Sequence, residues 1–491
     1  MRLRNYRYEG VAVLDGAIIM TLELVGARLI APYFGSTIFV WTAVIGVILG
    51  ALSVGYWYGG RLADRHASDA ELTRIMTAGA GVLLISLLLA PLSLELAAAL
   101  GGGLRLQAFV AAVLLFAPFN VLAGIISPYL AKLKLTSLSD AGSSMGRLYA
   151  AGTIGSILGT FITGYWLIGM MGSRVLGFSL IIVLLVSTLL LGFKTWRWQR
   201  LGLAVVAGMM MSWPHLGAAV PAGAVGSSLI YDGDSTYSRY MIRDAEYNGR
   251  TVRHLQTDKF GTQSAVYLDD FRDPPLVYIQ RYMEVAAAAD NPKRALIIGG
   301  GTYTLPRLLS DKYPGMAIDV VEIDPTLDDL ATEYFDYSPD PRIRLIHEDG
   351  RTFLNSNTQR YDLIYVDAFS SLTPPFTLTS TEAVRKLAAG LTPDGVIAVN
   401  LVSAIEGAEA GFLRAQLATY RDTMAHVSAR RASKDDYGSQ MMQNIILLAG
   451  RSADPVQRAG ATMKPLGVSA EGGQILTDDF APVEHLLQKM F

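Results

Sequence analysis

The sequence Arg-Ala-Leu-Ile-Ile-Gly-Gly-Gly at residues 294–301 sets the architecture of the C-terminal half of the chain. Residues 295–298 are apolar, as in a buried strand, and three glycines follow them directly. Because glycine has no Cβ, such a turn lets the backbone approach a ligand closely. This stretch therefore predicts a strand that leads into a ligand-binding loop, with a helix after the loop.

Strands and helices alternate after this loop, which is the pattern of a doubly wound parallel sheet. The next expected strands cover 318–324, 343–347, 361–366 and 396–400. Acids lie where three of these strands end: Glu322, which is 22 residues after Gly300, then Asp349 and Asp367. Ligands of open α/β sheets bind outside the carboxyl ends of the strands, and an acid at about 20 residues from the glycines meets ribose hydroxyls. This order predicts an α/β Rossmann-like domain that binds a nucleoside.

Residues 227–270 have short β-rich segments separated by Asp-Gly and Asn-Gly turn signals. They predict a small β subdomain, which a helix over 275–290 follows. We therefore divide the chain into three parts: a membrane domain (1–220), a linker with the β subdomain (221–275) and the Rossmann-like domain (276–491).

The first 220 residues have the composition of a membrane domain. Charged residues make up only 17% of the whole chain, against about 25% in soluble proteins, and most of them lie in the second half. Apolar stretches of about 20 residues are long enough to cross a bilayer. We expect seven such spans: 9–31, 37–60, 75–100, 105–131, 147–170, 174–193 and 201–220.

Basic residues in the loops predict the orientation of these spans. Twelve of them fall on one side: Arg2, Arg4, Arg7, Arg61, Arg65, Arg74, Lys132, Lys134, Arg147, Lys194, Arg197 and Arg200. The N-terminus is therefore expected to be cytoplasmic, in a bacterial inner membrane. Seven spans then place the C-terminal domain outside the cytoplasm. If 201–220 instead lies in the interface or re-enters, that domain is cytoplasmic.

Two carboxylates lie inside the first expected span, where a charge is costly and is by default a functional candidate. They are Asp15 and Glu23, and Arg28 follows near the end of the span. The structural alternative is that Glu23 pairs with Arg28 or a neighbouring helix and only stabilises the bundle. Glycines at 152, 155, 159 and 164 indicate close helix packing in the fifth span.

Composition excludes several classes of function. The net charge of −2 argues against a nucleic-acid-binding protein. The chain has no cysteine, which excludes disulfides, Cys-ligated zinc, iron–sulfur clusters and thiol nucleophiles. No metal site is expected, and the lipid bilayer is an expected partner.

Residues 228–490 resemble spermidine synthases, which are aminopropyltransferases with a methyltransferase-type Rossmann core. The matching segments are 297–301 (Ile-Ile-Gly-Gly-Gly), 321–325, 334–335, 347–350, Phe353 and 361–367. The whole chain resembles a bacterial group in which seven spans precede such a domain, through 23–28, 32–35 and 477–482. The resemblance implies a co-substrate, decarboxylated S-adenosylmethionine or S-adenosylmethionine, and makes a homodimer plausible.

The resemblance also implies roles for matched residues. Gly299, Gly300 and Gly301 would line the thioether side of the co-substrate, Glu322 would hold both ribose hydroxyls, and Asp349 with Gly350 would take the adenine amino group. Gln263 matches a glutamine that contacts the co-substrate from the β subdomain. Tyr278 matches a tyrosine that flanks the amine channel. Asp367 matches the general base, which an ammonium needs because it has no lone pair until it loses a proton.

Three positions depart from the family pattern, and all three lose an acid. Thr302 follows the glycines, Ser370 follows the fourth strand, and Gln280 replaces a glutamate near the channel tyrosine. Hydrogen bonds from a charged amine are worth about 1.5–3 kcal/mol each, so binding of a diamine such as putrescine is expected to weaken. The adenosine half of the site is intact and the amine half is altered. Residues 370–381 are expected to form a loop over the site.

Three functions remain open at this point. The first is an aminopropyltransferase that acts on a modified small-molecule amine. The second is an S-adenosylmethionine-dependent methyltransferase that acts on a lipid or a membrane-delivered amine. The third is a transporter or sensor with a nucleoside-binding domain, in which Asp15 and Glu23 would carry the function.

Overall fold

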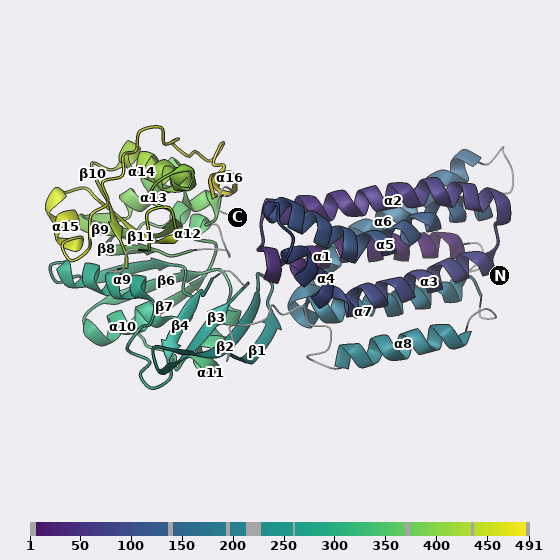
Figure 1. Cartoon of the computed structure of the whole chain (residues 1–491), viewed down its shortest axis with the longest axis horizontal. Coiled ribbons are helices and arrows are strands. Elements are labelled where there is room, and N and C mark those ends of the chain that lie inside the picture. Colours follow the sequence, from purple (N-terminus) through teal and green to yellow (C-terminus); the bar gives the residue numbers. More distant parts are fainter. Residues whose placement is uncertain are drawn as a thin grey trace. The chain divides into compact units, whose positions relative to one another are not determined.

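The computed structural model describes residues 6–135, 141–192, 197–212, 227–258, 261–368, 374–433 and 437–487 (Figure 1). The chain forms two compact units. The helical unit comprises Met1–Ala222 with Gly233–Arg239, and the α/β unit comprises Gly223–Asp232 with Tyr240–Phe491. The expected linker at 221–226 lies outside the described residues.

Long apolar helices build the helical unit. They are α1 (Arg7–Phe34), α2 (Ile38–His66), α3 (Asp69–Leu88), α4 (Ala90–Ala98), α5 (Gly103–Lys134), α6 (Ala141–Ile162), α7 (Ile168–Ser187) and α8 (Arg197–Ser212). A π-helical turn (Thr163–Leu167) joins α6 to α7, and a 3-10 turn (Thr188–Leu190) ends α7. Side-chain caps mark two starts, because Thr37 accepts from the Val40 amide and Ser68 from the Glu71 amide.

Five helical segments of the described residues are long and apolar enough to cross a membrane, where the sequence predicted seven spans. They are α1, α2, α3, α5 and the continuous segment Ala141–Leu190. That last segment has 50 residues and would be about 75 Å long if it were straight. Gly172, with φ 71° and ψ 159°, breaks it. Two predicted spans, 147–170 and 174–193, fall on this one segment. The seventh falls on α8, which has only 16 described residues.

Helices α1 and α6 pack with their backbones in contact. A Cβ on Gly155 would lie 1.9 Å from the carbonyl oxygen of Val13, and one on Gly16 would lie 2.3 Å from that of Gly152. Only glycine permits this approach, which is how membrane helices gain packing energy without a hydrophobic driving force. The expected close packing is therefore seen at Gly155 and at Gly159, where a Cβ would lie 2.6 Å from the carbonyl oxygen of Ala17, whereas a Cβ on Gly152 would be 3.8 Å from its nearest neighbour and one on Gly164 would meet nothing within 4 Å.

Ion pairs join the ends of four helices at one end of the helical unit. Lys134 pairs with Glu9, Lys132 with Asp64 at 2.7 Å, and Arg7 with Asp69 at 2.9 Å. The Tyr129 hydroxyl also donates to the carbonyl oxygen of His66 at 2.5 Å. The start of α1, the end of α2, the start of α3 and the end of α5 therefore lie together. Three of the basic residues that the sequence assigned to one side, Arg7, Lys132 and Lys134, lie at this end, which we call the basic end.

A seven-stranded sheet forms the centre of the α/β unit (Figure 1). Its order is β10-β11-β9-β8-β5-β6-β7. The strands are β5 (Arg294–Ile298), β6 (Ala317–Glu322), β7 (Ile343–His347), β8 (Tyr361–Val366), β9 (Leu391–Ser403), β10 (His426–Arg431) and β11 (Gln443–Gly450). Strands β9, β8, β5, β6 and β7 are parallel, whereas β11 pairs antiparallel with both β9 and β10. The sheet is thus mixed, whereas the sequence predicted a parallel one.

Helices cover both faces of this sheet. They are α9 (Val277–Ala288), α10 (Thr304–Lys312), α11 (Thr326–Tyr334), α12 (Gly350–Ser356), α13 (Thr381–Ala389), α14 (Gly411–Thr423), α15 (Ala453–Ala459) and α16 (Val483–Leu487), with short 3-10 turns at Phe376–Leu378 and Ala408–Ala410. Alternate residues of each strand enter two different cores: Ile297 lies with α9 and α10, and Ile298 lies with α12 and α13.

The predicted β subdomain is a four-stranded sheet. Its strands are β1 (Ser228–Asp234), β2 (Arg239–Tyr247), β3 (Arg250–Gln256) and β4 (Ser264–Tyr267), in that order. Tyr240, Ile242 and Val266 share a core with Leu327 and Phe335 around α11. The β subdomain therefore packs on the Rossmann-like core and belongs to the same unit.

Candidate active site

The glycine loop lies between the carboxyl ends of β5 and β8. The Gly299 amide donates to the carbonyl oxygen of Val321 at 2.9 Å, and the Asp367 amide donates to that of Ile298 at 2.8 Å. Gly299 has φ 96°, and a Cβ there would lie 2.3 Å from the carbonyl oxygen of Asp367. Glycine is therefore required at position 299 by both its backbone conformation and its contact with β8.

Glu322 at the end of β6 is held by this loop. Its Oε2 accepts from the Gly300 amide at 2.8 Å, and its Oε1 accepts from the Asp324 amide at 3.1 Å. The residue is 9% exposed, and burial raises the pKa of its carboxyl, while the backbone donors act in the opposite direction. A carboxylate has about four acceptor positions. Each Glu322 oxygen can thus accept a further hydroxyl while the backbone fixes its orientation.

Asp349 and Gly350 lie at the start of α12, beyond the end of β7. Asp349 caps the helix, with Oδ1 accepting from the Thr352 amide at 2.9 Å. A Cβ on Gly350 would lie 2.8 Å from Ile298 Cγ2. Glycine at position 350 therefore allows α12 to pack closely on β5. This packing brings Asp349 near the glycine loop.

Asp367 follows β8 and is held by two donors from other elements. Asn400 Nδ2 donates to its Oδ1 at 3.0 Å, and the Tyr278 hydroxyl donates to the same carboxylate. Parallel pairing of Val366 with Val399 puts Asp367 and Asn400 at one level of the sheet. The structure thus brings together the predicted base and the predicted channel tyrosine.

Burial raises the pKa of the Asp367 carboxyl to about 6, although the bonds from Asn400 and Tyr278 lower it. Burial and the nearby Asp367 raise the pKa of Tyr278 well above its usual range. The tyrosine therefore stays a hydrogen-bond donor. A carboxyl whose pKa is close to neutral is suited to take a proton from an ammonium and to release it again.

A second amide stands behind Asn400. Asn444 Nδ2 on β11 donates to Asn400 Oδ1 at 2.9 Å. With its oxygen engaged, Asn400 presents its NH₂ group to Asp367. We call Asn444, Asn400 and Asp367 the amide relay. Sequence reasoning missed both asparagines, although Asn400 was the one polar residue closing an apolar predicted strand.

Two further tyrosines form an aromatic wall behind Tyr278. The rings of Tyr278 and Tyr282 meet edge to face at 5.8 Å between centroids, and those of Tyr282 and Tyr365 lie 4.8 Å apart. The Tyr282 hydroxyl donates to the carbonyl oxygen of Val366 at 3.2 Å. These contacts fix α9 against the strand that carries Asp367.

The β subdomain reaches the glycine loop through Ser264. Its Oγ accepts from the Thr302 amide at 3.2 Å, and it lies 2.9 Å from where a Cβ on Gly301 would be. Gln263 precedes Ser264, and its Nε2 lies 3.4 Å from Thr257 Oγ1. Thr302 is 2% exposed, and its hydroxyl is paired with that of Thr304 at 3.2 Å. The position that usually carries an acid is thus a buried neutral hydroxyl.

One predicted substrate residue, Gln280, is not brought to this site. Gln280 lies on the exposed face of α9, and its Nε2 donates to the carbonyl oxygen of Pro274 at 3.0 Å. Helical periodicity explains this, because Gln280 is two residues from Tyr278 and so points to the opposite side. Ser370 lies outside the described residues, as does most of the first half of the loop expected over 370–381.

The membrane-domain candidates lie in the helical unit. Asp15 is buried and Glu23 is half-buried on α1. Arg28 donates to the carbonyl oxygen of Ser235 at 2.7 Å and also to that of Thr236. Residues 233–239 belong to the helical unit, so these bonds are internal to it.

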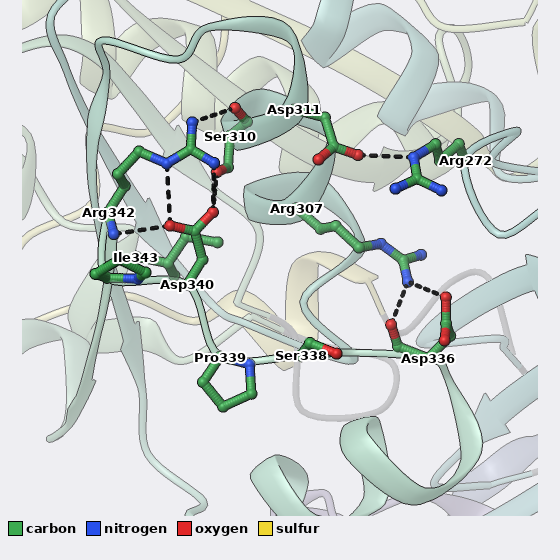
Figure 2. A pocket seen from close by; sticks show the side chains of 11 residues that line it. Arg272, Arg307, Ser310, Asp311, Asp336, Ser338, Pro339, Asp340, Arg342 and Ile343 are labelled. Atoms are coloured by element: carbon green, nitrogen blue, oxygen red, sulfur yellow. Dashed lines mark hydrogen bonds and ion pairs between the residues drawn. The ribbon is translucent and has the colours of Figure 1, made fainter.

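Figure 2 shows a different pocket of the α/β unit, with a volume of about 460 Å³. It lies where β7 begins, whereas the glycine loop, Glu322 and Asp367 lie where strands end. Its charged side chains pair with each other: Arg272 with Asp311 at 2.9 Å, Arg342 with Asp340 at 2.6 Å and Arg307 with Asp336 at 3.8 Å. The charges of these side chains are thus compensated within the pocket.

Comparison with known proteins identifies the C-terminal domain. Residues 278–410 match the family of the spermine/spermidine synthase domain. The probable polyamine aminopropyl transferase of Bifidobacterium longum (strain NCC 2705) is 38% identical over 176 residues, which are 36% of this chain and 38% of that protein. The polyamine aminopropyltransferase of Vibrio vulnificus (strain CMCP6) is 23% identical over 287 residues, which are 53% of this chain and 92% of that protein.

A methyltransferase also appears among the relatives. Putrescine N-methyltransferase 2 of Nicotiana attenuata is 30% identical over 183 residues, which are 34% of this chain and 44% of that protein. The chain thus spans less than half the length of this protein and of the Bifidobacterium relative. Together the matches support a transferase enzyme with a C-terminal spermidine synthase domain.

Proposed function

We propose that the α/β unit transfers an aminopropyl group from decarboxylated S-adenosylmethionine to a small-molecule amine. The amine nitrogen attacks the methylene carbon next to the sulfonium, the carbon–sulfur bond breaks, and its electron pair stays on sulfur in methylthioadenosine. The ammonium proton passes to Asp367. The relatives from Bifidobacterium and Vibrio are named for this class of reaction.

The carboxylate of Asp367 is the observation that carries the proposal. It lies beside the glycine loop, and donors from Asn400 and Tyr278 orient it. A base held in this way accepts a proton without moving, and a positioned general base contributes about 10²–10⁴-fold to a rate. A carboxylate that only capped a helix would accept hydrogen bonds from the amides of that helix. Asp367 instead accepts from side chains of two other elements, Asn400 of β9 and Tyr278 of α9.

The remaining residues fit the adenosine part of the co-substrate. Glu322 has acceptor capacity left for the two ribose hydroxyls, and the loop of Gly299, Gly300 and Gly301 permits close approach of the thioether. Asp349 uses Oδ1 for its helix cap, and we assign its other oxygen to the adenine amino group. Gln263 would close the site from the β subdomain, next to Ser264.

Methyl transfer from S-adenosylmethionine to an amine is the second candidate. The buried hydroxyl of Thr302 favours it, because an acid at this position would repel the carboxylate of that donor. The similarity to a putrescine N-methyltransferase points in the same direction. Both reactions need the same base and the same nucleophile, so the donor alone distinguishes them.

The first test is calorimetric titration of the purified chain with decarboxylated S-adenosylmethionine, S-adenosylmethionine and methylthioadenosine. Tighter binding of the decarboxylated donor supports aminopropyl transfer, and tighter binding of S-adenosylmethionine supports methyl transfer. If none of the three binds, the proposal is wrong.

Asp367→Asn provides the catalytic test. We expect it to reduce turnover by at least about 10²-fold with little change in nucleoside affinity. Asp394→Asn is the matched control, because Asp394 is an exposed aspartate of the same unit. Turnover that survives Asp367→Asn at the level of this control would remove Asp367 as the base.

For the helical unit we propose a domain of the bacterial inner membrane with its basic end in the cytoplasm. The break at Gly172 lets the segment Ala141–Leu190 cross twice, as the sequence predicts, and α8 would be the last crossing. An odd number of crossings from a cytoplasmic basic end would put the catalytic domain on the extracytoplasmic side.

A further inference from the structure

Tyr303 has a backbone conformation that residues with side chains rarely adopt. It directly follows Thr302 at the end of the glycine loop and has φ 57° and ψ 26°, in the left-handed region. Glycine enters this region freely, whereas another residue is strained there and stays only where its surroundings hold it. The side chain of Tyr303 is 0% exposed. Its contacts therefore have to explain why a tyrosine occupies this position.

The ring of Tyr303 packs directly against Gly300. A Cβ on Gly300 would overlap Cε1 of this ring and would lie 3.3 Å from the Cβ of Glu322. The Tyr303 amide also donates to the carbonyl oxygen of Gly300 at 2.9 Å, which closes the turn of the loop. Because the Gly300 amide donates to Glu322 Oε2, a shift of the Tyr303 ring would move the amide that orients Glu322.

The hydroxyl of Tyr303 is bonded to Asp328 of α11. It donates to Oδ1 at 2.5 Å, and the ring also lies against that of Tyr337, with 4.8 Å between the centroids. Burial and the bond to Asp328 raise the pKa of Tyr303 well above its usual range, so the hydroxyl remains a donor. The bond to Asp328 thus fixes the far end of the ring that Gly300 contacts.

His347 completes the chain of hydrogen bonds. Its Nε2 lies 3.0 Å from Asp328 Oδ2, and Nε2 donates in this pair because a carboxylate only accepts. His347 is the last residue of β7, and in the parallel register it pairs with Glu322, the last residue of β6. Side chains paired in this way lie side by side on one face of the sheet. Tyr303, Asp328 and His347, which we call the loop anchor, therefore lie around Glu322.

We propose that the loop anchor is a set of positioning residues for the ribose of the co-substrate. It holds the Gly300 amide and the Glu322 carboxylate in the orientation in which both carboxylate oxygens accept ribose hydroxyls. A glycine at position 303 would adopt the same backbone without strain, but it would supply neither the ring nor the hydroxyl. This inference rests on the function proposed above, from which it takes the nucleoside site and the role of Glu322.

The test measures binding of methylthioadenosine and of its deoxyribose analogue to the full-length chain by calorimetry. The analogue lacks one of the hydroxyls assigned to Glu322, so the ratio of the two dissociation constants reports how well Glu322 is oriented. We expect the wild type to prefer methylthioadenosine by about tenfold or more, as for a hydrogen bond to a charged group. Tyr303→Phe keeps the ring and removes the hydroxyl, and we expect it to lower this preference to about threefold or less.

Two substitutions of Asp328 separate its hydrogen bonds from its charge. Asp328→Leu removes both acceptors, and we expect it to lower the preference as much as Tyr303→Phe does. Asp328→Asn keeps an oxygen that accepts from the Tyr303 hydroxyl, and we expect it to retain the wild-type preference within about twofold. Tyr247→Phe is the matched control, because Tyr247 is a tyrosine of the same unit that is 51% exposed.

The ratio distinguishes positioning from a general loss of stability. A variant that only loosens the fold binds both nucleosides less tightly by the same factor, and its ratio stays at that of Tyr247→Phe. An unchanged ratio in Tyr303→Phe and Asp328→Leu would therefore overturn the inference and leave the proposed function in place. If the wild type binds neither nucleoside, the proposed function fails and the inference fails with it. If Tyr303→Phe does not fold, Asp328→Leu decides by the same ratio, because the side chain of Asp328 is 34% exposed and tolerates substitution better.

Discussion

The environment of Asp367 sets the chemistry of the site at the scale of single residues. Burial alone would favour the protonated acid, which cannot act as a base. The donors on Tyr278 and Asn400 oppose this effect, and together they leave the pKa of Asp367 at about 6. The carboxyl is therefore ionised at neutral pH but remains basic enough to accept a proton.

The first prediction concerns the pH dependence of this base. We expect kcat/KM to fall as the pH drops below about 6, because protonated Asp367 cannot take the proton of the amine. Tyr278→Phe removes a donor to the carboxylate, raises the pKa of Asp367 and moves this acid limb upward by about one pH unit. Asn444→Leu is expected to move it in the same direction by less, because Asn400 then loses the bond that orients its amide.

Initial rates from pH 5 to pH 9 measure these shifts. Phe480→Leu serves as a control of similar apolar change at an exposed position. An acid limb that stays in place in both variants would contradict the role of the amide relay and of Tyr278.

The second prediction concerns the choice of donor. Thr302→Asp restores an acid beside the glycine loop, where the amine of the decarboxylated donor would be bound. We expect the affinity for decarboxylated S-adenosylmethionine, relative to that for S-adenosylmethionine, to rise by about tenfold or more. The new carboxylate would form a charge-assisted hydrogen bond with the amine of the decarboxylated donor and would repel the carboxylate of S-adenosylmethionine. Thr302→Ser keeps a neutral hydroxyl and is the control in competitive titrations. An equal ratio in both variants would show that position 302 does not contact the part of the donor that differs.

Close packing of α1 on α6 determines the helical unit at the scale of elements. The third prediction is that Gly155→Ala destabilises this unit, because the new Cβ would lie 1.9 Å from the carbonyl oxygen of Val13. Overpacking of this kind costs about 1–3 kcal/mol. Gly146→Ala on the same helix is the control, since a Cβ there meets nothing within 4 Å. Thermal unfolding in detergent measures both variants, and equal midpoints would show that the two helices do not depend on this contact.

Charged hydrogen bonds fix the C-terminal segment to the Rossmann-like core. Arg351 of α12 donates to both carboxylate oxygens of Asp478, at 2.9 and 2.5 Å, and Ser380, the N-cap of α13, donates to the same carboxylate at 2.6 Å. Arg351 holds the pKa of Asp478 below its usual range. In the sequence, only the resemblance to a family drew attention to the segment 477–482. In the structure this segment connects α12 and α13 through Asp478.

The fourth prediction belongs to the whole molecule and concerns the side of the membrane. An odd number of crossings with a cytoplasmic basic end puts the α/β unit outside the cytoplasm. We therefore expect a reporter that is active only in the periplasm to be active when fused after Phe491, and a fusion after Lys134 to be inactive. If both fusions are inactive, α8 does not cross, and the α/β unit then has direct access to cytosolic sulfonium donors.

The sequence by itself determined the features that follow from local chemistry. Apolar stretches of membrane length, glycines after a buried strand and acids where strands end are all periodic or adjacent in sequence. They were enough to predict a helical unit, a small β subdomain and a Rossmann-like core, and to select Asp367, whereas Tyr278 was selected only through the resemblance to a family. The count of seven spans went beyond this information, because periodicity does not show that Ala141–Leu190 is one helical segment broken at Gly172.

Only the tertiary structure decided which side chains meet. Asn400 and Asn444 are 44 residues apart, and they act on Asp367 because an antiparallel β11 lies beside β9, an arrangement that the expected parallel sheet did not contain. Gln280 was placed by resemblance in the site, but the turn of α9 directs it to the exposed face. Contacts of this kind depend on three-dimensional register, which no local pattern of residues specifies.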